Sequence, residues 1–146
     1  MHRLIIAFCM TIVSILGSSS YAELTVDEVV VGGYILKPGP YSYLSKKESL
    51  AELLNRVGGL PVTPDDLKKY QAGEPVAQVR VVLHRNGKKI EFRIDPKSSQ
   101  LWDLKVQNRD AVEVVRLGLF EKNDFSSTLK LTKPKLGEQV VPPNGP

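Results

Sequence analysis

Three local patterns in this sequence predict an α+β fold, in which one helix packs on a mixed β-sheet. An amphipathic helix follows Ser45, two alternating strands flank Asn86-Gly87, and a Pro-Gly turn at 37–40 separates two short β-rich runs. A hairpin alone leaves its apolar face open to water, so the single helix would have to cover both hairpins.

The first predicted hairpin lies between residues 29 and 44. Residues 29–31 are three valines, Gly32-Gly33 interrupts them, and residues 34–36 resume the strand. The glycine pair indicates a bulge or a close backbone approach. The turn at 37–40 then leads into a second short strand at 41–44, because proline fixes φ and glycine supplies a positive φ.

The helix is predicted from Ser45 to Val57. Ser45 and Glu48 have the S-x-x-E spacing of a capping box. An apolar stripe follows at helical spacing, formed by Leu50, Leu53, Leu54 and Val57. Gly58-Gly59 can adopt the left-handed backbone conformation that ends a helix, and Pro61 prevents the helix from continuing.

The rest of the chain divides into an excursion, three strands and an arm. Residues 60–78 are predicted to be a long excursion, with one short helical turn from Thr63 to Tyr70. Strands at 79–85 and 88–95 form a hairpin around Asn86-Gly87, the strongest local signal for a type I′ turn. Residues 98–104 would cross from one strand to the next and make Leu101, Trp102 and Leu104 available for the core. A strand at 111–115, a strand or packed arm at 117–131 and a flexible tail at 132–146 would follow.

The element order is therefore β-β-α-β-β-β, which predicts a β-grasp, or ubiquitin-like, roll. Residues 23–116 would form this domain, and residues 117–146 a C-terminal arm with a Pro-rich tail.

Residues 1–22 are typical of a secretory signal peptide. Arg3 precedes an apolar run at 4–17, and small residues lead to a cleavage site after Ala22. The alternative, a membrane anchor, needs about 20 apolar residues, more than this run has. Cys9, the single cysteine, lies inside the run. The exported chain would then carry no thiol for a disulfide or a metal site.

The composition excludes several functional classes. The 146 residues are 42% hydrophobic and 25% charged, as in soluble globular domains. The formal net charge is +4, and the basic residues are interspersed with acidic ones, so nucleic-acid binding is not expected.

Four blocks in the predicted order resemble the SLBB family, the soluble-ligand-binding β-grasp domains found in polysaccharide biosynthesis and export proteins. They are residues 30–41, with V-V-G-G-Y and K-P-G-P-Y; residues 49–59, with S-L and V-G-G; residues 81–87, V-V-L-H-R-N-G; and residues 104–114, which end the domain. Arg109 stands where the family pattern has glycine, and Val57 where it has alanine. The resemblance implies a free-standing module with an accessory role in extracellular polysaccharide biosynthesis or export.

No catalytic constellation is evident in the sequence. His84 is the only histidine after Ala22 and has no neighbouring nucleophile, so it is interpreted as a solvent-facing strand residue. Asp65-Asp66 is interpreted as a helix start, and the glycine pairs lack a phosphate-binding spacing. We therefore expect no enzymatic activity, no cofactor and no metal.

The candidate ligand-binding residues are aromatic rings and lysines. Tyr41 and Tyr43 share a strand face and would point outward if Leu44 is in the core. The remaining candidates are Lys46, Lys47, Lys68 and Tyr70. Basic pairs could contact an acidic exopolysaccharide, although such pairs, including Lys88-Lys89, are usually solvated surface. Trp102 is interpreted as a core residue.

These features predict an exported, non-catalytic binding module of the bacterial envelope, located in the periplasm or otherwise exported. It would recognise a glycan or an outer-membrane export protein. The alternative is a structural adaptor that docks on an envelope complex through residues 117–146, without binding a small ligand. A hydrolase that uses His84 is the third possibility.

Overall fold

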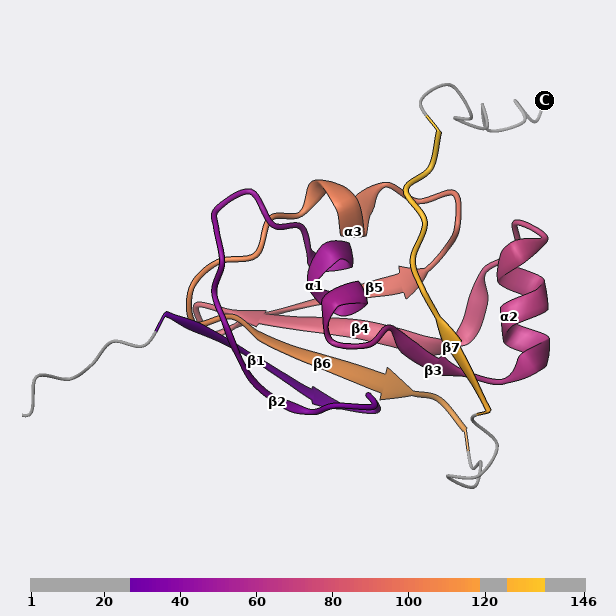
Figure 1. Ribbon diagram of the computed structural model, residues 1–146, viewed down its shortest axis with the longest axis horizontal. Coiled ribbons are helices and arrows are strands. Elements are labelled where there is room, and N and C mark those ends of the chain that lie inside the picture. Colours follow the sequence, from indigo (N-terminus) through magenta and orange to yellow (C-terminus); the bar gives the residue numbers. More distant parts are fainter. Residues whose placement is uncertain (1–26, 119–125, 136–146) are drawn as a thin grey trace, which may run out of the picture.

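A computed structural model describes residues 27–118 and 126–135 of the chain, so the predicted signal peptide lies outside the described residues. The fold is mixed α+β (Figure 1). Its elements are β1 (Glu28–Gly33), β2 (Gly39–Ser42), α1 (Leu50–Arg56), β3 (Leu60–Val62), α2 (Pro64–Gln71), β4 (Val76–Arg85), β5 (Lys88–Ile94), α3 (Gln100–Asp103), β6 (Ala111–Arg116) and β7 (Ser127–Leu129). Among the described helices, α2 lies where the sequence predicted one short helical turn, whereas α3 was not predicted as a helix.

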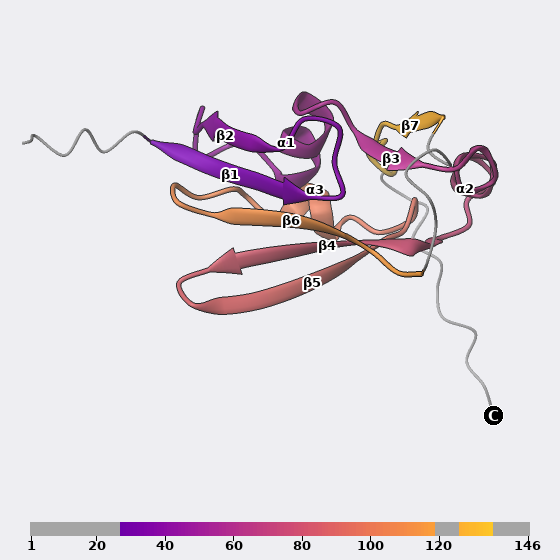
Figure 2. The same ribbon diagram turned by 90° about the horizontal axis from the view of Figure 1, so that it is seen from below.

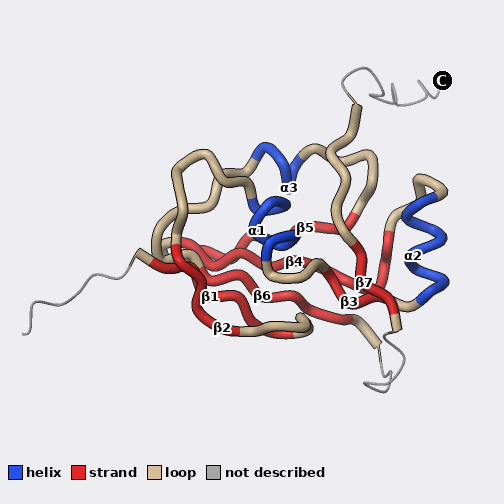
Figure 3. Tube along the Cα trace, in the orientation of Figure 1, coloured by secondary structure: helices blue, strands red, loops and turns tan. Residues whose placement is uncertain are grey.

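Two sheets organise these elements. The larger has five strands in the order β2-β1-β6-β4-β5, and β1 and β6 run parallel while the other neighbours are antiparallel. The smaller sheet pairs β3 with β7 in antiparallel fashion. Helices α1 and α3 lie on one face of the five-stranded sheet (Figure 3). Strands β3 and β7 and helix α2 lie together at one end of it (Figures 1 and 2).

The first hairpin forms between β1 and β2, but its turn lies earlier than predicted. Residues 34–36 form no strand, and β2 already begins at Gly39. The predicted close approach is found at Gly33, which has a φ of 77°. A Cβ atom there would lie 2.3 Å from the carbonyl oxygen of Val114. Glycine at this position therefore lets the end of β1 pass close to β6. The Tyr34 amide then donates to the carbonyl oxygen of Val114 at 2.6 Å.

Helix α1 begins four residues later than predicted, because its capping box is formed by Ser49 and Glu52. The Glu52 amide donates to Ser49 Oγ at 3.2 Å, and the Ser49 amide donates to Glu52 Oε2 at 2.7 Å. These bonds from Ser49 to the charged carboxylate lower the pKa of Glu52. Glu48 and Leu50 bond to the backbone of residues 104–106, and Ser49 between them is extended, so the helix cannot start at Ser45. Glu48 pairs with Arg56 instead, at 2.8 Å.

The core lies between α1 and the five-stranded sheet. The predicted apolar stripe of α1 is buried along its whole length. The sheet contributes alternate residues from its central strands: Val29, Val31, Val81, Leu83, Val112 and Val114. Burial of each such side chain contributes about 1.5–3 kcal/mol relative to exposure.

The hairpin of β4 and β5 forms around Asn86-Gly87 as predicted. Both turn residues have positive φ, 51° and 72°, as a type I′ turn requires. Phe92 and Ile94 face the core, but Ile90 remains 38% exposed because it lies on the edge strand near the turn.

The β6 strand is preceded by a buried ion pair. Arg85 Nε and Nη2 donate to the two carboxylate oxygens of Asp110 at 2.9 and 2.6 Å. This bidentate bond raises the pKa of the Arg85 guanidinium. Arg109, immediately before Asp110, has a φ of 68°.

The segment predicted as a long excursion is largely regular. It contains β3 and α2, whose N-cap Thr63 accepts from the Asp66 amide at 3.1 Å, as predicted. Strand β7 then pairs with β3, Leu60 opposite Leu129, which confirms a strand in the arm. The prediction of an unstructured excursion is wrong because β3 gains its partner from residues far away in the sequence. None of the described helices is long and apolar enough to cross a membrane.

Candidate binding groove

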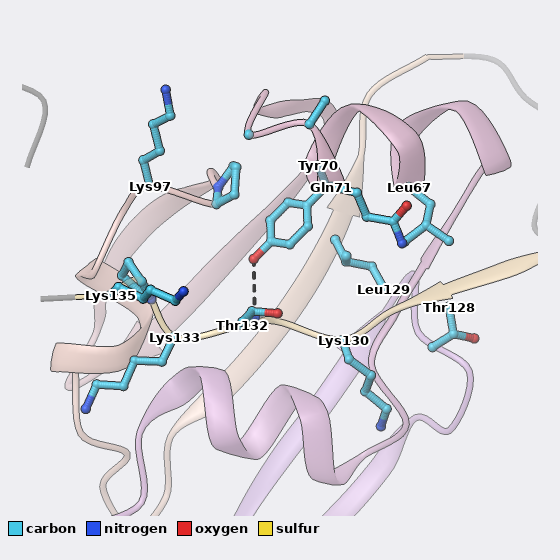
Figure 4. A pocket seen from close by; sticks show the side chains of 14 residues that line it. Leu67, Tyr70, Gln71, Lys97, Thr128, Leu129, Lys130, Thr132, Lys133 and Lys135 are labelled. Atoms are coloured by element: carbon cyan, nitrogen blue, oxygen red, sulfur yellow. Dashed lines mark hydrogen bonds between the residues drawn. The ribbon is translucent and has the colours of Figure 1, made fainter. Parts of the chain in front are cut away.

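An open groove of about 1110 Å³ lies at the end of the fold where α2, the loop after β5 and the C-terminal segment meet (Figure 4). The segment of residues 127–135, named here the strap, forms one wall. Helix α2 and Gly73 form the second wall, and Pro96 and Lys97 complete the lining. We name this feature the lysine groove for the charge of its lining.

The strap is held in place by specific contacts. Leu129 and Leu131 are buried in the core. The side chain of Asn55 bonds both backbone groups of Leu131, donating to its oxygen at 2.9 Å and accepting from its nitrogen at 2.8 Å. A Cβ atom at Gly59 would lie 2.6 Å from the carbonyl oxygen of Leu129, so glycine lets the strap pass close to α1. The strap is therefore part of the fold.

Tyr70 of α2 lies at the base of the groove, and its hydroxyl accepts a hydrogen bond from the Thr132 amide at 3.4 Å (Figure 4). Only 7% of the residue is exposed. Burial raises the pKa of Tyr70, and the nearby charge of Asp95 acts in the same direction, so the phenol stays neutral. The prediction of an exposed Tyr70 is wrong, because the strap covers its ring.

The charge of the groove comes from four lysines: Lys97, Lys130, Lys133 and Lys135. Lys130 Nζ donates to the Asn55 carbonyl oxygen at 2.6 Å. Over residues 27–118 and 126–135, the other three ammonium groups form neither a hydrogen bond nor an ion pair. Among the side chains that line the groove in the described structure, none is acidic.

The acidic residues nearest to this charge lie outside the lining. Asp95 accepts from the backbone amide of Lys97 at 2.8 Å. Glu52 experiences the charge of Lys133, which contributes weakly to lowering its pKa. Neither carboxylate forms an ion pair with a groove lysine in the described part of the chain.

The predicted candidates on the first hairpin do not join this groove. Tyr41 and Tyr43 are half-buried and pack against the core, whereas Leu44 is 63% exposed. The condition for outward-pointing tyrosines, a Leu44 in the core, is therefore not met: strand pairing turns Tyr41 and Val29 to the same face. The Tyr41 hydroxyl donates to the carbonyl of Lys37, and the Arg56 guanidinium lies 5.8 Å from the centre of its ring.

The predicted lysines are separate surface residues. Lys46 and Lys47 are exposed in the turn before α1, and Lys68 is exposed on α2. Tyr70 alone among the six predicted ligand residues lines the groove. The tyrosines of the hairpin and the lysines of the turn and helix thus form no common site with it.

The other residues singled out in the sequence take structural positions. His84 is exposed on β4, with Nε2 3.4 Å from Glu113. Asp65 and Asp66 lie in the first turn of α2, as predicted. Trp102 is half-buried on α3 and packs against the core. In the parts of the chain that the structure describes, no group of His, Cys, Asp or Glu side chains could hold a metal ion.

Sequence reasoning missed the four lysines of the groove. The available signal was the alternation of Leu129 and Leu131 with Lys130, which is typical of a half-buried strand. The prolines that follow directed the interpretation towards a tail instead.

Comparisons of this chain with protein-family models, with curated proteins and with solved structures find no match.

Proposed function

We propose that this chain is an exported, non-catalytic binding module that serves the biosynthesis or export of an extracellular polysaccharide, and that it binds a glycan in the lysine groove. The observation that carries the proposal is the groove itself, a hollow of about 1110 Å³ whose walls come from three separate segments. Binding sites of small ligands and chain segments are concave and largely preformed.

The proposed fold family is the β-grasp, specifically an SLBB-like domain. Counting only the strands of the larger sheet, its order is second-first-fifth-third-fourth, with the first and last strands parallel. This arrangement supports a ubiquitin-like roll. Arg109 adds support, because it holds a φ of 68° at the position where the family pattern has glycine.

The groove's location fits a binding role on such a scaffold. It lies between α2, the loop after β5 and the strap, and of these α2 and the strap are additions to the five-stranded sheet and α1. Binding residues are commonly carried by segments that a rigid scaffold positions. Gln71, Thr128 and Thr132 supply polar groups in the lining that suit sugar hydroxyls.

The adaptor alternative is less well supported. Strand β7 is already paired with β3, and Asn55 bonds the backbone of Leu131. A partner that took β7 as its own strand in place of β3 would first have to break those contacts.

The proposal is tested by affinity electrophoresis of the chain, produced from its complete sequence in a bacterium and purified from the envelope fraction. Gels contain dextran, polygalacturonate or polysaccharide extracted from the source organism. Retardation by at least one of them supports a glycan-binding module. Unchanged mobility in every gel, together with co-purification of envelope proteins only, would contradict it in favour of the adaptor.

Export is tested on the same preparation by mass spectrometry. The proposal expects a chain that begins at Glu23, after removal of residues 1–22. A full-length chain retained in the cytoplasm would contradict export.

A further inference from the structure

We propose that the lysine groove selects polyanionic polysaccharides whose sugars carry carboxylates, over neutral polysaccharides. This inference rests on the proposed function and names the class of glycan. It depends on two independent properties of the groove: a lining that carries lysines and, among the described residues, no carboxylate, and the inaccessibility of the single aromatic ring in that lining.

The charge of the lining favours an anionic chain. Lys97, Lys133 and Lys135 have ammonium groups without a bonded partner in the described part of the chain. In Figure 4 these three lysines lie on the same side of Tyr70, and the side chains of Lys97 and Lys133 extend in opposite directions from there. A lining that carries four lysines and, as far as the structure describes it, no carboxylate has a positive electrostatic potential, which favours an anionic chain over a neutral one.

The lining offers little to a neutral sugar. Flat aromatic faces supply the apolar contact that sugar rings use, but Tyr70 is the groove's one aromatic residue and is 7% exposed. The remaining donors and acceptors are on Gln71, Thr128 and Thr132. Hydrogen bonds to neutral hydroxyls replace bonds to water and gain little, whereas bonds to a charged group gain more.

The same absence of a stacking surface separates the proposed ligand from a nucleic acid. Proteins that bind single strands combine a basic channel with exposed aromatic side chains on which the bases stack. The groove has the basic residues without an exposed ring.

The decisive experiment measures the affinity of the purified full chain for fluorescently labelled polygalacturonate and dextran of matched length, at low salt. We expect binding of polygalacturonate that weakens as sodium chloride rises from about 50 to 200 mM, because added salt screens exposed charges. Dextran should bind at least about tenfold more weakly than polygalacturonate, because it has no charge to pair with the lysines.

Two triple variants with equal loss of charge locate the site. Lys97→Gln, Lys133→Gln and Lys135→Gln together should weaken polygalacturonate binding by about tenfold or more. The matched control combines Lys46→Gln, Lys47→Gln and Lys88→Gln, three exposed lysines outside the groove lining, and should change the affinity by less than about twofold. Lys130 is left intact because it bonds the Asn55 carbonyl.

Each other outcome overturns a defined part of the account. Equal binding of dextran and polygalacturonate would refute selection by charge while leaving a glycan-binding module. An equal loss of polygalacturonate affinity in the two triple variants would refute the groove as the source of selectivity. Tighter binding of a thymidine oligonucleotide of matched charge would replace the glycan with a nucleic acid. Failure of both polysaccharides to bind would refute this selectivity, and the proposed function falls with it only if the extracted polysaccharide also leaves the mobility of the chain unchanged.

Discussion

Two regions of the molecule are stabilised in different ways. The sheet region, made of the five-stranded sheet and α1, buries alternate residues of its strands under one continuous helical stripe. The strap region, made of β3, α2 and residues 127–135, depends on a three-residue strand pair, on the side chain of Asn55 and on a smaller set of buried apolar side chains: Leu60, Val62, Tyr70, Leu129 and Leu131. The first region has many redundant contacts, and the second has few.

This difference assigns separate roles to the two regions. A densely packed sheet with α1 forms a scaffold that would persist if the strap opened. The strap region carries the lysine groove, and segments with few buried contacts open at a lower free energy than the core. Under the proposed function, ligand binding and local stability would therefore be coupled in the strap region. The following variants test whether the two regions are separate.

The largest effect is expected in the sheet region, from Asp110→Ala. Asp110 is 2% exposed and accepts two bonds from Arg85 and one from the Gln107 amide. Its removal leaves a partly buried guanidinium without its partner, so the free energy of unfolding should fall by about 3–5 kcal/mol, measured by urea denaturation. In the control variant Asp27→Ala, which removes an exposed carboxylate, the free energy of unfolding should fall by less than about 1 kcal/mol. Equal losses in both variants would contradict a structural role for the ion pair.

Leu129→Ala is expected to act on the strap region. The side chain is fully buried opposite Leu60, so its truncation should cost about 2–5 kcal/mol. We expect faster hydrogen exchange at the amides of β3 and β7, while those of β4 keep their protection. Uniform acceleration across β4 and β7 would mean that the two regions unfold as one unit, which would remove the distinction between them.

Asn55→Ala tests the polar anchor of the strap. Two bonds to the Leu131 backbone are lost, and the expected cost of opening the strap is about 1–3 kcal/mol, again measured by hydrogen exchange at β7. The matched variant Asn108→Ala removes an asparagine of the sheet region that bonds Glu28 and Asp27. If this variant opened the strap as much as Asn55→Ala, the anchor would not be specific.

The smallest effect at neutral pH is expected from Tyr70→Phe, within about 0.5 kcal/mol of the wild type. Because burial raises the pKa of Tyr70, the folded state holds the phenolic proton more tightly than the unfolded state. The resulting stability is fully present below the ordinary tyrosine pKa of about 10 and is lost as the pH rises through the raised value. Denaturant unfolding between pH 8 and 11 should therefore show a steeper alkaline loss for the wild type than for the variant. Parallel pH profiles would contradict this role of Tyr70.

The sheet region was largely predictable because its information is local. Asn86 and Gly87 determine a turn by their own backbone preferences, and Gly33 marks the close approach that the structure contains. The start of α1 was not predictable, since Ser45 and Ser49 both begin an S-x-x-E pattern that precedes the same apolar stripe. Only the pairing of residues 48–50 with 104–106 decides between them.

The strap region was not predictable because its contacts are remote. Asn55 and Leu131 are 76 residues apart, and no local pattern indicates that they bond. Tyr70 was expected to be exposed since the sequence shows nothing that would cover it. The groove lysines were missed for the same reason, the lack of a local signal. Lys133 and Lys135 flank a proline in a segment that composition alone assigned to a tail.

The most direct test of the central claim is a map of amide chemical-shift changes when oligogalacturonate is added to the isotope-labelled full chain. We expect the changes to cluster in α2, in residues 95–97 and in the strap, with the sheet region little affected. Changes centred on Tyr41, Tyr43, Lys46 and Lys47, or spread evenly over the exposed lysines, would contradict a binding site built by the strap.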